Sequence, residues 1–458
     1  MNIRTLLTPV ALLAAPGVTL ASEAVHHPMA ETGDWRAILC VVIFVVAYII
    51  VMTEEFHYLR KSKPMILAAG SIWLIIGAAA RQYQVSEDIL HEEVVYILHE
   101  FSSLFLFLLV SMTYINTLNE RNFFGFIRSW LVRRGLSYRA LFWVTGVLTF
   151  FFSSIADNLV SALLMGAVIM AVDKQNKRFV QVSCVNIVLA ANCGGAFSPF
   201  GDITTLMVWQ AKQVAFFEFF RLFLPAVATY VVPAAIMVFA IPKGRPEHHG
   251  DVEEMKRGSL RICFLFLCTI ALAVTFEQAF HLPPYLGMMT GLGLLMVFTY
   301  YVWMSSIKPI EQRLDIYNEV SRAQWDTLLF FFGITFAVGG LSFLGYMTQA
   351  SHLMYGEMGP TKANILVGVM SALIDNIPVM FAILQMEPQM EHFQWLLVTL
   401  TVGVGGSLLS IGSAAGVGLM GVAREQYTFF SHLKWAPVIA LGYAAGIGTH
   451  FLIRAVMS

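Results

Sequence analysis

Two aspartates surrounded by apolar residues are the groups in this sequence best suited to ionic chemistry. Asp157 lies in the hexapeptide SSIADN at 153–158, and Asp375 lies in the matching hexapeptide SALIDN at 371–376. An ionised side chain in hydrocarbon costs roughly 2.5–3.5 kcal/mol on insertion scales, so such residues usually serve a function. The alternative is that both aspartates only cap broken helices, but the neighbouring Ser or Asn would serve that purpose. The repeated motif therefore predicts a duplicated functional site.

Two further breaks in apolar segments carry polar side chains. Glycines and a proline interrupt the segment CGGAFSPFGD at 193–202, and glycines and serines interrupt GGSLLSIGS at 405–413. Neither composition favours a continuous helix. Unwound backbone at membrane depth is tolerated only where it is buried in protein or lines a wet cavity, so we expect both breaks and both hexapeptides to meet. The side chains expected there are Ser153, Asp157, Asn158, Asn192, Ser198, Asp202, Thr204 and Thr205 from the first half, and Ser371, Asp375, Asn376, Ser410 and Ser413 from the second.

The chemistry of this set indicates a cation site. Its three Asp are the only ionisable members, and it contains no Arg or Lys, which an anion site would need. Carboxylate, hydroxyl and carbonyl oxygens are hard ligands that suit small hard cations. We therefore predict that Na⁺ binds at Asp157, Asp202 and Asp375. Close carboxylates in a poorly solvated cleft also hold protons more tightly, so competition between H⁺ and Na⁺ would make an exchanger that needs no cofactor.

The composition is that of an all-α polytopic membrane protein. Of the 458 residues, 58% are hydrophobic and 12% are charged, against about 25% charged in soluble domains. The length allows about ten to twelve spans of roughly 20 residues. A net charge near zero and the lack of a long basic tract argue against nucleic acid as a partner. The five cysteines lie in apolar segments without a CxxC pair, so we interpret them as buried thiols.

The chain begins with the pattern of a secretory signal peptide at 1–21, with Arg4, an apolar run and small residues up to Ala21. An uncleaved first helix is the alternative. Arginines interleaved with aromatic residues at 119–139 predict an amphipathic helix on the inner leaflet. Apolar runs predict spanning helices at 35–52, 64–80, 90–116, 217–241, 260–280, 283–303, 325–345 and 435–456.

Two halves of the chain share one order of elements, a hairpin followed by a broken helix. Cations at 173–178 stay in the cytoplasm only if the first hairpin dips into the membrane and turns back, whereas the segment after the second hairpin has no Lys or Arg. The hairpins therefore enter from opposite sides, which is the inverted-repeat pattern of secondary transporters. The halves are 22–241 and 260–458, joined by a cytoplasmic linker at 242–259, with hairpins at 140–172 and 364–386 and broken helices at 179–211 and 393–422.

The three motifs SSIADN, CGGAFSPFGD and SALIDN resemble those of NhaD-type sodium/proton antiporters. That family belongs to the ion transporter superfamily, which includes arsenite and citrate carriers. The resemblance implies exchange of cytoplasmic Na⁺ or Li⁺ for external H⁺ across a bacterial inner membrane, with tolerance of sodium and alkaline pH. It also implies a homodimer with a scaffold and a mobile core that moves like an elevator.

The resemblance also carries over functional residues. Ser413 stands where the first half has Asp202, so the two half-sites differ in charge. Glu100 and Ser153 match the family pattern more loosely, and His99 beside Glu100 suggests an accessory role in pH response, with a surface or capping role as the alternative. The residues that match are Asp157, Asn158, Asn192, Asp202, Thr204, Thr205, Ser371, Asn376, Ser410 and Ser413.

Two other functions fit the sequence less well. An arsenite or dicarboxylate carrier of the same superfamily would be favoured by neutral hairpin tips, whereas both tips here carry Asp. An intramembrane protease could use Asp157 and Asp375 as an aspartyl pair, but the paired glycine breaks would have no role in it. We therefore expect a transporter and not an enzyme.

Overall fold

The computed structural model describes residues 33–57, 59–246, 253–304 and 315–457. These residues form helices joined by turns and loops, with no strand among them. The signal peptide predicted at 1–21 lies outside the described residues. The all-helical fold class is confirmed.

Eight helical segments in the described part of the chain are long and apolar enough to cross a membrane, which confirms the polytopic membrane protein. Each corresponds to a predicted span. The segment at 216–240 is less regular than expected, because short 3₁₀ turns flank its central α-helix. The eight are α1 (Trp35–Met52), α3 (Ser62–Tyr83), α4 (Glu87–Glu120), α10 (Phe223–Met237) between η2 (Phe216–Leu222) and η3 (Val238–Ala240), α11 (Ser259–Phe280), α12 (Pro284–Met304), α14 (Trp325–Phe343) and α21 (Ala436–Met457).

Four interrupted elements lie between these helices, and each breaks where the sequence predicts it. The two arms of the first hairpin have 16 residues each, or about 24 Å, and are therefore shorter than the roughly 30 Å hydrocarbon core. The arms of the second hairpin have 11 and 10 residues. We keep the name first hairpin for α6 (Tyr138–Ser153) with α7 (Asn158–Asp173), whose arms pack on one another. The second hairpin denotes α16 (Pro360–Met370) with α17 (Asn376–Gln385), and the broken helices are α8 (Lys177–Gly195) with α9 (Ile203–Gln210), and α18 (His392–Gly405) with α19 (Ala414–Val422).

Several smaller features differ from the sequence predictions. The second hairpin begins at Pro360 rather than at 364, because Gly359 turns the chain at a φ of +83° and Pro starts a helix well. Of the five cysteines predicted to be buried, Cys268 is exposed and Cys263 is half-buried; both lie on α11. The bend formed by α15 and η5 was not predicted. The short elements are α2 (Glu54–His57), α5 (Phe123–Arg133, shorter than the predicted 119–139), α13 (Ile316–Ser321), α15 (Tyr346–Ser351), the π-helical η5 (His352–Glu357) and α20 (Phe429–Leu433).

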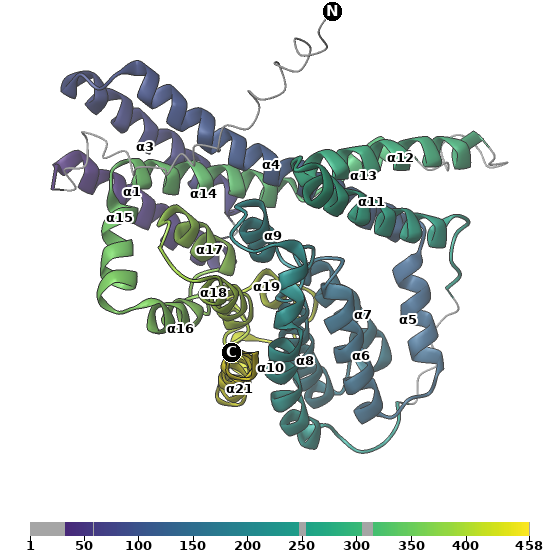
Figure 1. Ribbon diagram of the computed structural model, residues 1–458. Coiled ribbons are helices and arrows are strands. Elements are labelled where there is room, and N and C mark those ends of the chain that lie inside the picture. Colours follow the sequence, from purple (N-terminus) through teal and green to yellow (C-terminus); the bar gives the residue numbers. More distant parts are fainter. Residues whose placement is uncertain (1–32, 58, 247–252, 305–314, 458) are drawn as a thin grey trace, which may run out of the picture.

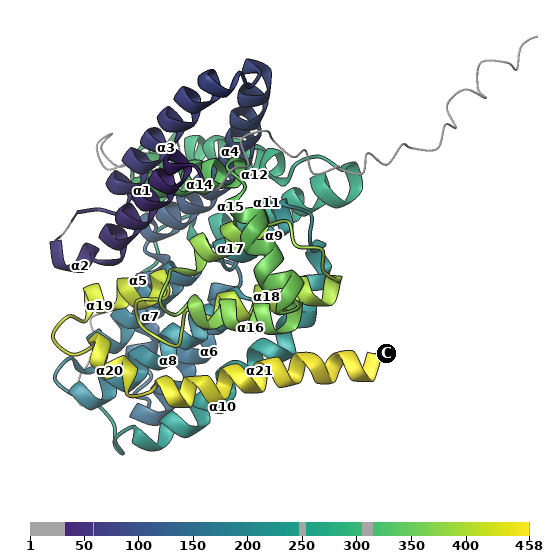
Figure 2. The ribbon, with the colours of Figure 1, turned by 90° about the vertical axis from the view of Figure 1, so that its left-hand side faces the viewer.

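The helices form two layers that differ in continuity (Figure 1). We call the first the continuous layer; it comprises α1, α3, α4, α11, α12 and α14, which pack on one another. The second, the interrupted layer, comprises both hairpins, both broken helices, α10 and α21. Figure 2 shows the same division from the side, with α1, α3, α4 and α14 above α6, α8, α10 and α21. The layers meet where α14 packs on α17 and α4 packs on α9.

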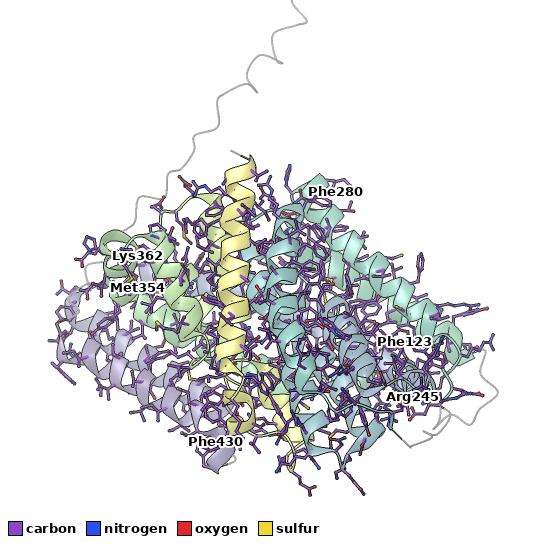
Figure 3. The ribbon with its side chains drawn as sticks, turned by 90° about the horizontal axis from the view of Figure 1, so that it is seen from below. Phe123, Arg245, Phe280, Met354, Lys362 and Phe430 are labelled. Atoms are coloured by element: carbon purple, nitrogen blue, oxygen red, sulfur yellow. The ribbon has the colours of Figure 1, made fainter. Side chains whose placement is uncertain are left out.

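Helix α21 closes the interrupted layer on its outer side. Seen from below, it runs across the middle of the molecule (Figure 3), and it packs on α10 and α18. The close approach to α10 depends on Gly442 and Gly446, because a Cβ at either would meet the α10 backbone or side chains at 2.4 Å or less. The interrupted layer is therefore a packed unit rather than a loose set of hairpins.

Candidate ion-binding site

The side chain of Asp202 lies at the centre of the candidate site. Asp202 is buried at the N-cap of α9, and its Oδ1 accepts a 3.1 Å hydrogen bond from the backbone N–H of Thr204. Its Oδ2 accepts two more, each 2.9 Å long, from the Nδ2 atoms of Asn158 and Asn376. These two donors come from the tips of the first and second hairpins. One carboxylate thus connects both hairpins to a broken helix.

The two tip aspartates occupy the N-cap positions of α7 and α17. Neither Asp157 nor Asp375 makes a capping hydrogen bond of standard geometry through its side chain, although each carboxylate lies beside the first backbone N–H groups of its helix. Asp157 has a φ of +60°, a conformation that residues other than Gly adopt rarely, and such strained residues cluster at functional sites. The Oδ1 atom of Asp375 is buried and has no hydrogen-bond partner among the described residues. The charges of both aspartates act on Asp202.

The three aspartates do not form a single carboxylate cage. Within the residues that the structure describes, no three His, Cys, Asp or Glu side chains gather closely enough to hold a metal ion. Asp202 is joined to the hairpin tips through the amides of Asn158 and Asn376 instead. An ion bound here would therefore combine a single close carboxylate with neutral oxygens, a ligand set that suits a hard monovalent cation.

Asn192, fully buried on α8, extends this network into the second half of the chain. Its Oδ1 accepts a 3.2 Å hydrogen bond from Nδ2 of Asn158. Its Nδ2 donates to the Oγ atoms of Ser407 and Ser413, at 2.8 and 2.9 Å. Ser413 is the N-cap of α19, the position that Asp202 has on α9. The network therefore runs without interruption from one broken helix to the other.

Two of the predicted ligand hydroxyls are bonded to backbone instead. Oγ of Ser153 donates to the carbonyl of Ala191 at 2.6 Å, and Oγ of Ser371 donates to the carbonyl of Val402 at 2.9 Å. Each bond joins the first arm of a hairpin to the broken helix of the same half. These serines position the hairpin tips rather than face the centre.

Of the remaining predicted hydroxyls, that of Thr205 is bonded to backbone, whereas those of Thr204 and Ser410 have no partner among the described residues. The Oγ1 atom of Thr205 donates a hydrogen bond to backbone and lies 2.8 Å from the carbonyl oxygen of Ser198, which stabilises the break. Thr204 Oγ1 lies beside the Asp202 carboxylate, yet it has no partner of hydrogen-bonding geometry among the described residues. Oγ of Ser410 is likewise buried and unpaired there. Unsatisfied buried hydroxyls cost about 1–3 kcal/mol each, so Thr204 and Ser410 are the hydroxyls available to bind an ion.

The contacts of the glycines repeat in the two halves. A Cβ at Gly194 would lie 2.0 Å from the carbonyl oxygen of Phe150 on α6, and one at Gly405 would lie 1.9 Å from that of Gly368 on α16. Each broken helix thus lies against the backbone of its own hairpin in the same way. The opposite orientation of the two halves stays a prediction. The same correspondence holds for Gly195 and Gly406, which lie against the carbonyls of Gly201 and Gly412.

The second arms of the hairpins pack across the halves. Helix α7 of the first hairpin packs on α19, and α17 of the second hairpin packs on α9. Gly418 lets α19 approach α7, because a Cβ there would lie 2.4 Å from Leu159. This exchange of partners brings the two hairpin tips to the same pair of broken helices.

Glu100 and His99, the predicted accessory residues, lie away from Asp202. The carboxylate of Glu100 accepts hydrogen bonds from Tyr96 at 2.9 Å and from Gln385 at 3.0 Å. Gln385 is the last residue of the ten-residue α17, about 14 Å along the helix from the tip. His99 is exposed. A role of these residues in pH response stays a prediction.

Sequence reasoning missed Ser407, although it directly follows the Gly405-Gly406 break. Its carbonyl is 2.8 Å from Nε2 of His432, and Nδ1 of that histidine is 2.6 Å from the Tyr427 hydroxyl. Because a carbonyl only accepts, His432 carries a proton on Nε2 and accepts from Tyr427 on Nδ1. Both side chains are buried, and His432 holds the backbone of Ser407 while Asn192 holds its side chain.

We expect Asn192→Ala to lower the free energy of unfolding by about 2 kcal/mol, because it leaves buried partners in both halves unpaired. Thermal unfolding in detergent would measure the loss. Asn186→Ala is the matched control, since Asn186 is also buried on α8 but its side chain donates only to the carbonyl of Phe142. An Asn192→Ala protein at least as stable as the control would contradict the bridging role.

Known proteins resemble this chain along nearly its whole length. The model of the citrate transporter family, CitMHS, matches residues 5–403. The Na(+)/H(+) antiporter NhaD of Alkalimonas amylolytica is 52% identical, over 97% of this chain and 95% of that protein. NhaD of Vibrio cholerae is 48% identical, over 98% and 97%. Sodium/proton antiporter 1 of Arabidopsis thaliana is 31% identical, over 97% of this chain and 76% of that protein.

Proposed function

Because this chain belongs to the NhaD family of Na⁺/H⁺ antiporters, within the citrate transporter family, we propose that it exchanges Na⁺ for H⁺ at Asp202 and the two hairpin tips. The family membership confirms the resemblance seen in the three motifs and makes the protein a transporter rather than an enzyme. Asp157, Asp202 and Asp375 supply the negative charge of the proposed site, and Thr204 and Ser410 supply neutral oxygens.

The observation that carries this proposal is the pair of hydrogen bonds from Asn158 and Asn376 to one oxygen of Asp202. The hydrogen bonds from these two amides and from the backbone N–H of Thr204 offset part of the cost of keeping this buried carboxylate ionised without a bound cation. An amide side chain also has a carbonyl oxygen. When Na⁺ binds Asp202, rotation of the two amides would turn these oxygens toward the ion, so both hairpin tips would respond to its arrival.

Proton binding at Asp202 has a different consequence for the same amides. A protonated carboxyl carries one O–H donor and keeps its carbonyl acceptor. It can therefore stay hydrogen-bonded to Asn158 and Asn376 at the hairpin tips without a bound cation. Na⁺ and H⁺ thus compete for one group, and each neutralises it. A transporter whose ionised, empty site cannot cross the membrane, but whose Na⁺-bound and protonated sites can, performs exchange.

The two layers suit an elevator movement. All four interrupted elements belong to one layer, and six of the eight candidate spans form the other. We propose that the interrupted layer carries the site and slides along the continuous layer. The inverted repeat, a homodimer formed through the continuous layer, residence in a bacterial inner membrane, transport of Li⁺ and a role in sodium and alkaline tolerance belong to the same proposal.

Everted membrane vesicles test the function directly. With a pH gradient in place, NaCl and LiCl are expected to collapse the gradient between pH 7 and 9, whereas choline chloride is not. Uptake of citrate and arsenite is measured in the same vesicles. Uptake of either anion by the inserted protein, with no response to any cation, would overturn the antiporter and favour the anion carrier.

A further inference from the structure

A continuous series of hydrogen bonds leads from His432 to Asp202. Nε2 of His432 donates to the carbonyl of Ser407 at 2.8 Å, and Oγ of Ser407 accepts from Asn192 at 2.8 Å. Oδ1 of Asn192 accepts from Asn158 at 3.2 Å, and Asn158 donates to Asp202 at 2.9 Å. All five side chains are buried. A histidine outside the proposed site is therefore connected to its central carboxylate.

Local contacts fix both the position and the tautomer of the His432 ring. The ring belongs to the five-residue α20, whose N-cap Thr428 forms a capping box with Ser431. Nδ1 of the ring accepts a hydrogen bond from the hydroxyl of Tyr427. This bond keeps the ring proton on Nε2, because the partner of one ring nitrogen decides which nitrogen is protonated. The ring is therefore set to donate to the Ser407 carbonyl.

The turn before α20 is anchored to the first half of the chain. Nε2 of Gln181, on α8, donates to the carbonyl of Gln426 at 2.8 Å. Nε2 of Gln426 donates to the carbonyl of Lys174, directly after α7, at 3.3 Å. Helix α20 itself packs on α8. His432 is thus supported by the same two helices that carry the asparagines of the series, so the whole arrangement forms a closed frame.

The hydroxyl of Ser407 helps to decide which way the Asn192 amide faces. Nδ2 of Asn192 has two N–H donors, and the Oγ atoms of Ser407 and Ser413 accept them. The amide oxygen is thereby turned toward Asn158. The backbone of Ser407, which His432 holds, thus controls the orientation of an amide on which the first hairpin tip depends.

We propose that His432 is a positioning residue of the transport site. It holds Ser407 where Asn192 can donate to its hydroxyl, and through these two residues it aligns the first hairpin tip with the Asp202 carboxylate. This inference rests on the proposed exchange at Asp202 and the hairpin tips. Loss of the ring would leave the buried carbonyl of Ser407 without its donor, which is costly, so the segment around it would shift to find another partner.

A positioning role predicts a change in affinity for Na⁺. Misaligned amides bind the ion less well, so the KM for Na⁺ rises. The charge of the site is not altered, so exchange continues when Na⁺ is saturating. A merely structural role would instead lower the saturated rate, because fewer molecules would be active, and it would leave the KM of the active ones unchanged.

The experiment measures the KM for Na⁺ and the saturated rate in everted vesicles, with rates normalised to inserted protein. We expect His432→Leu, which removes both hydrogen bonds of the ring, to raise the KM roughly tenfold and to keep the saturated rate within about twofold of the wild type. His432→Gln should restore most of the affinity, because its amide keeps a donor for Ser407. Tyr427→Phe should give an intermediate KM, because the ring is then free to adopt the other tautomer.

His450→Leu is the matched control. His450 is also a buried histidine, and its Nε2 lies 3.2 Å from the carbonyl of Phe393. Phe393 is the second residue of α18, whereas the break with Ser407 follows the last residue of that helix. The control therefore loses a similar ring and a similar contact at the far end of the same helix, and its KM should match that of the wild type.

Ser407→Ala tests the route of the effect. This change removes the hydroxyl to which Asn192 donates, so it should raise the KM by itself. Adding His432→Leu should then raise the KM no further, although thermal unfolding in detergent should occur at a lower temperature. If the KM of the double variant instead rises by the product of the two single effects, His432 acts by another route and the proposal is wrong.

The outcomes also separate this inference from the function on which it rests. An unchanged KM in His432→Leu, together with Na⁺-driven exchange by the wild type, would refute the positioning role and leave the exchange proposal standing. Should His432→Leu fail to insert, an unchanged KM in Tyr427→Phe would refute the role in the same way. A wild-type protein that does not respond to Na⁺ would refute the exchange proposal itself.

Discussion

Asp202→Asn is expected to reduce Na⁺-driven exchange at least 100-fold while the protein still folds. An amide has nearly the size of a carboxyl group, and its oxygen can still accept from Asn158 and Asn376, which now donate to one carboxylate oxygen, so that only the hydrogen bond from Thr204 is lost. It has no charge to bind Na⁺ and no site that gains or loses a proton near neutral pH. A 100-fold loss corresponds to about 2.8 kcal/mol, less than the Coulomb energy of a carboxylate and a cation in contact in a poorly solvated site.

The measurement is the initial rate of gradient collapse in everted vesicles, normalised to the amount of inserted protein. Asp157→Asn and Asp375→Asn are expected to be less severe, because each removes a charge that acts on the centre from a hairpin tip. Asp173→Asn is the matched control, since Asp173 lies at the far end of α7 and accepts a 2.7 Å hydrogen bond from Tyr138. An active Asp202→Asn protein alongside an inactive Asp157→Asn protein would move the centre of the site to the first hairpin tip.

The helical framework was largely predictable from local composition. The predicted span at 35–52 coincides with α1, and the break after Ser153 occurs where polar residues interrupt an apolar run. Such features depend on residues close together in the chain, since hydrophobic length and glycine content act over one or two helical turns. The bend of α15 and η5 was not predictable in this way: Gly345 and Gly359, both at positive φ, mark its two ends, but its course between them depends on the packing of α15 against α14 and α17.

The geometry of the site was only partly predictable. The sequence places an Asp and an Asn at each hairpin tip, and the charge argument favoured the Asp as the group that meets Asp202. In the structure the Asn makes that contact. Which of two adjacent side chains points to the centre depends on the dihedral angles at the tip, such as the φ of +60° at Asp157, and these follow from packing against a distant segment.

Lys61 illustrates a second limit. In the sequence it is one of several cations that mark the cytoplasmic end of a helix, and the positive-inside rule is enough to explain its presence there. Its neighbour in space, Phe330, whose ring centroid lies 4.8 Å from the Lys61 Nζ, is separated from it by about 270 residues of chain. No local pattern connects the two, so the contact appears only once α3 and α14 are packed together.

The second large effect is expected from Gly405→Ala, and equally from Gly194→Ala in the other half. The added methyl would lie 1.9 Å from the carbonyl oxygen of Gly368, or 2.0 Å from that of Phe150, and a backbone carbonyl in a packed hairpin cannot move aside as a flexible side chain does. Overpacking of this kind costs about 3 kcal/mol. We therefore expect each broken helix to separate from its hairpin, with a loss of both thermal stability and exchange.

Gly421→Ala is the control, because Gly421 also lies in a broken helix but has open space around its Cβ position. Reaction of Cys193 with a membrane-permeant maleimide reports the separation locally, since this fully buried thiol is adjacent to Gly194. With Cys263 and Cys268 replaced by Ser to remove the two thiols that are not buried, labelling should stay low in the control and rise in Gly194→Ala. Unchanged stability, exchange and labelling in both Gly194→Ala and Gly405→Ala would show that the hairpins do not dock on the broken helices through these glycines.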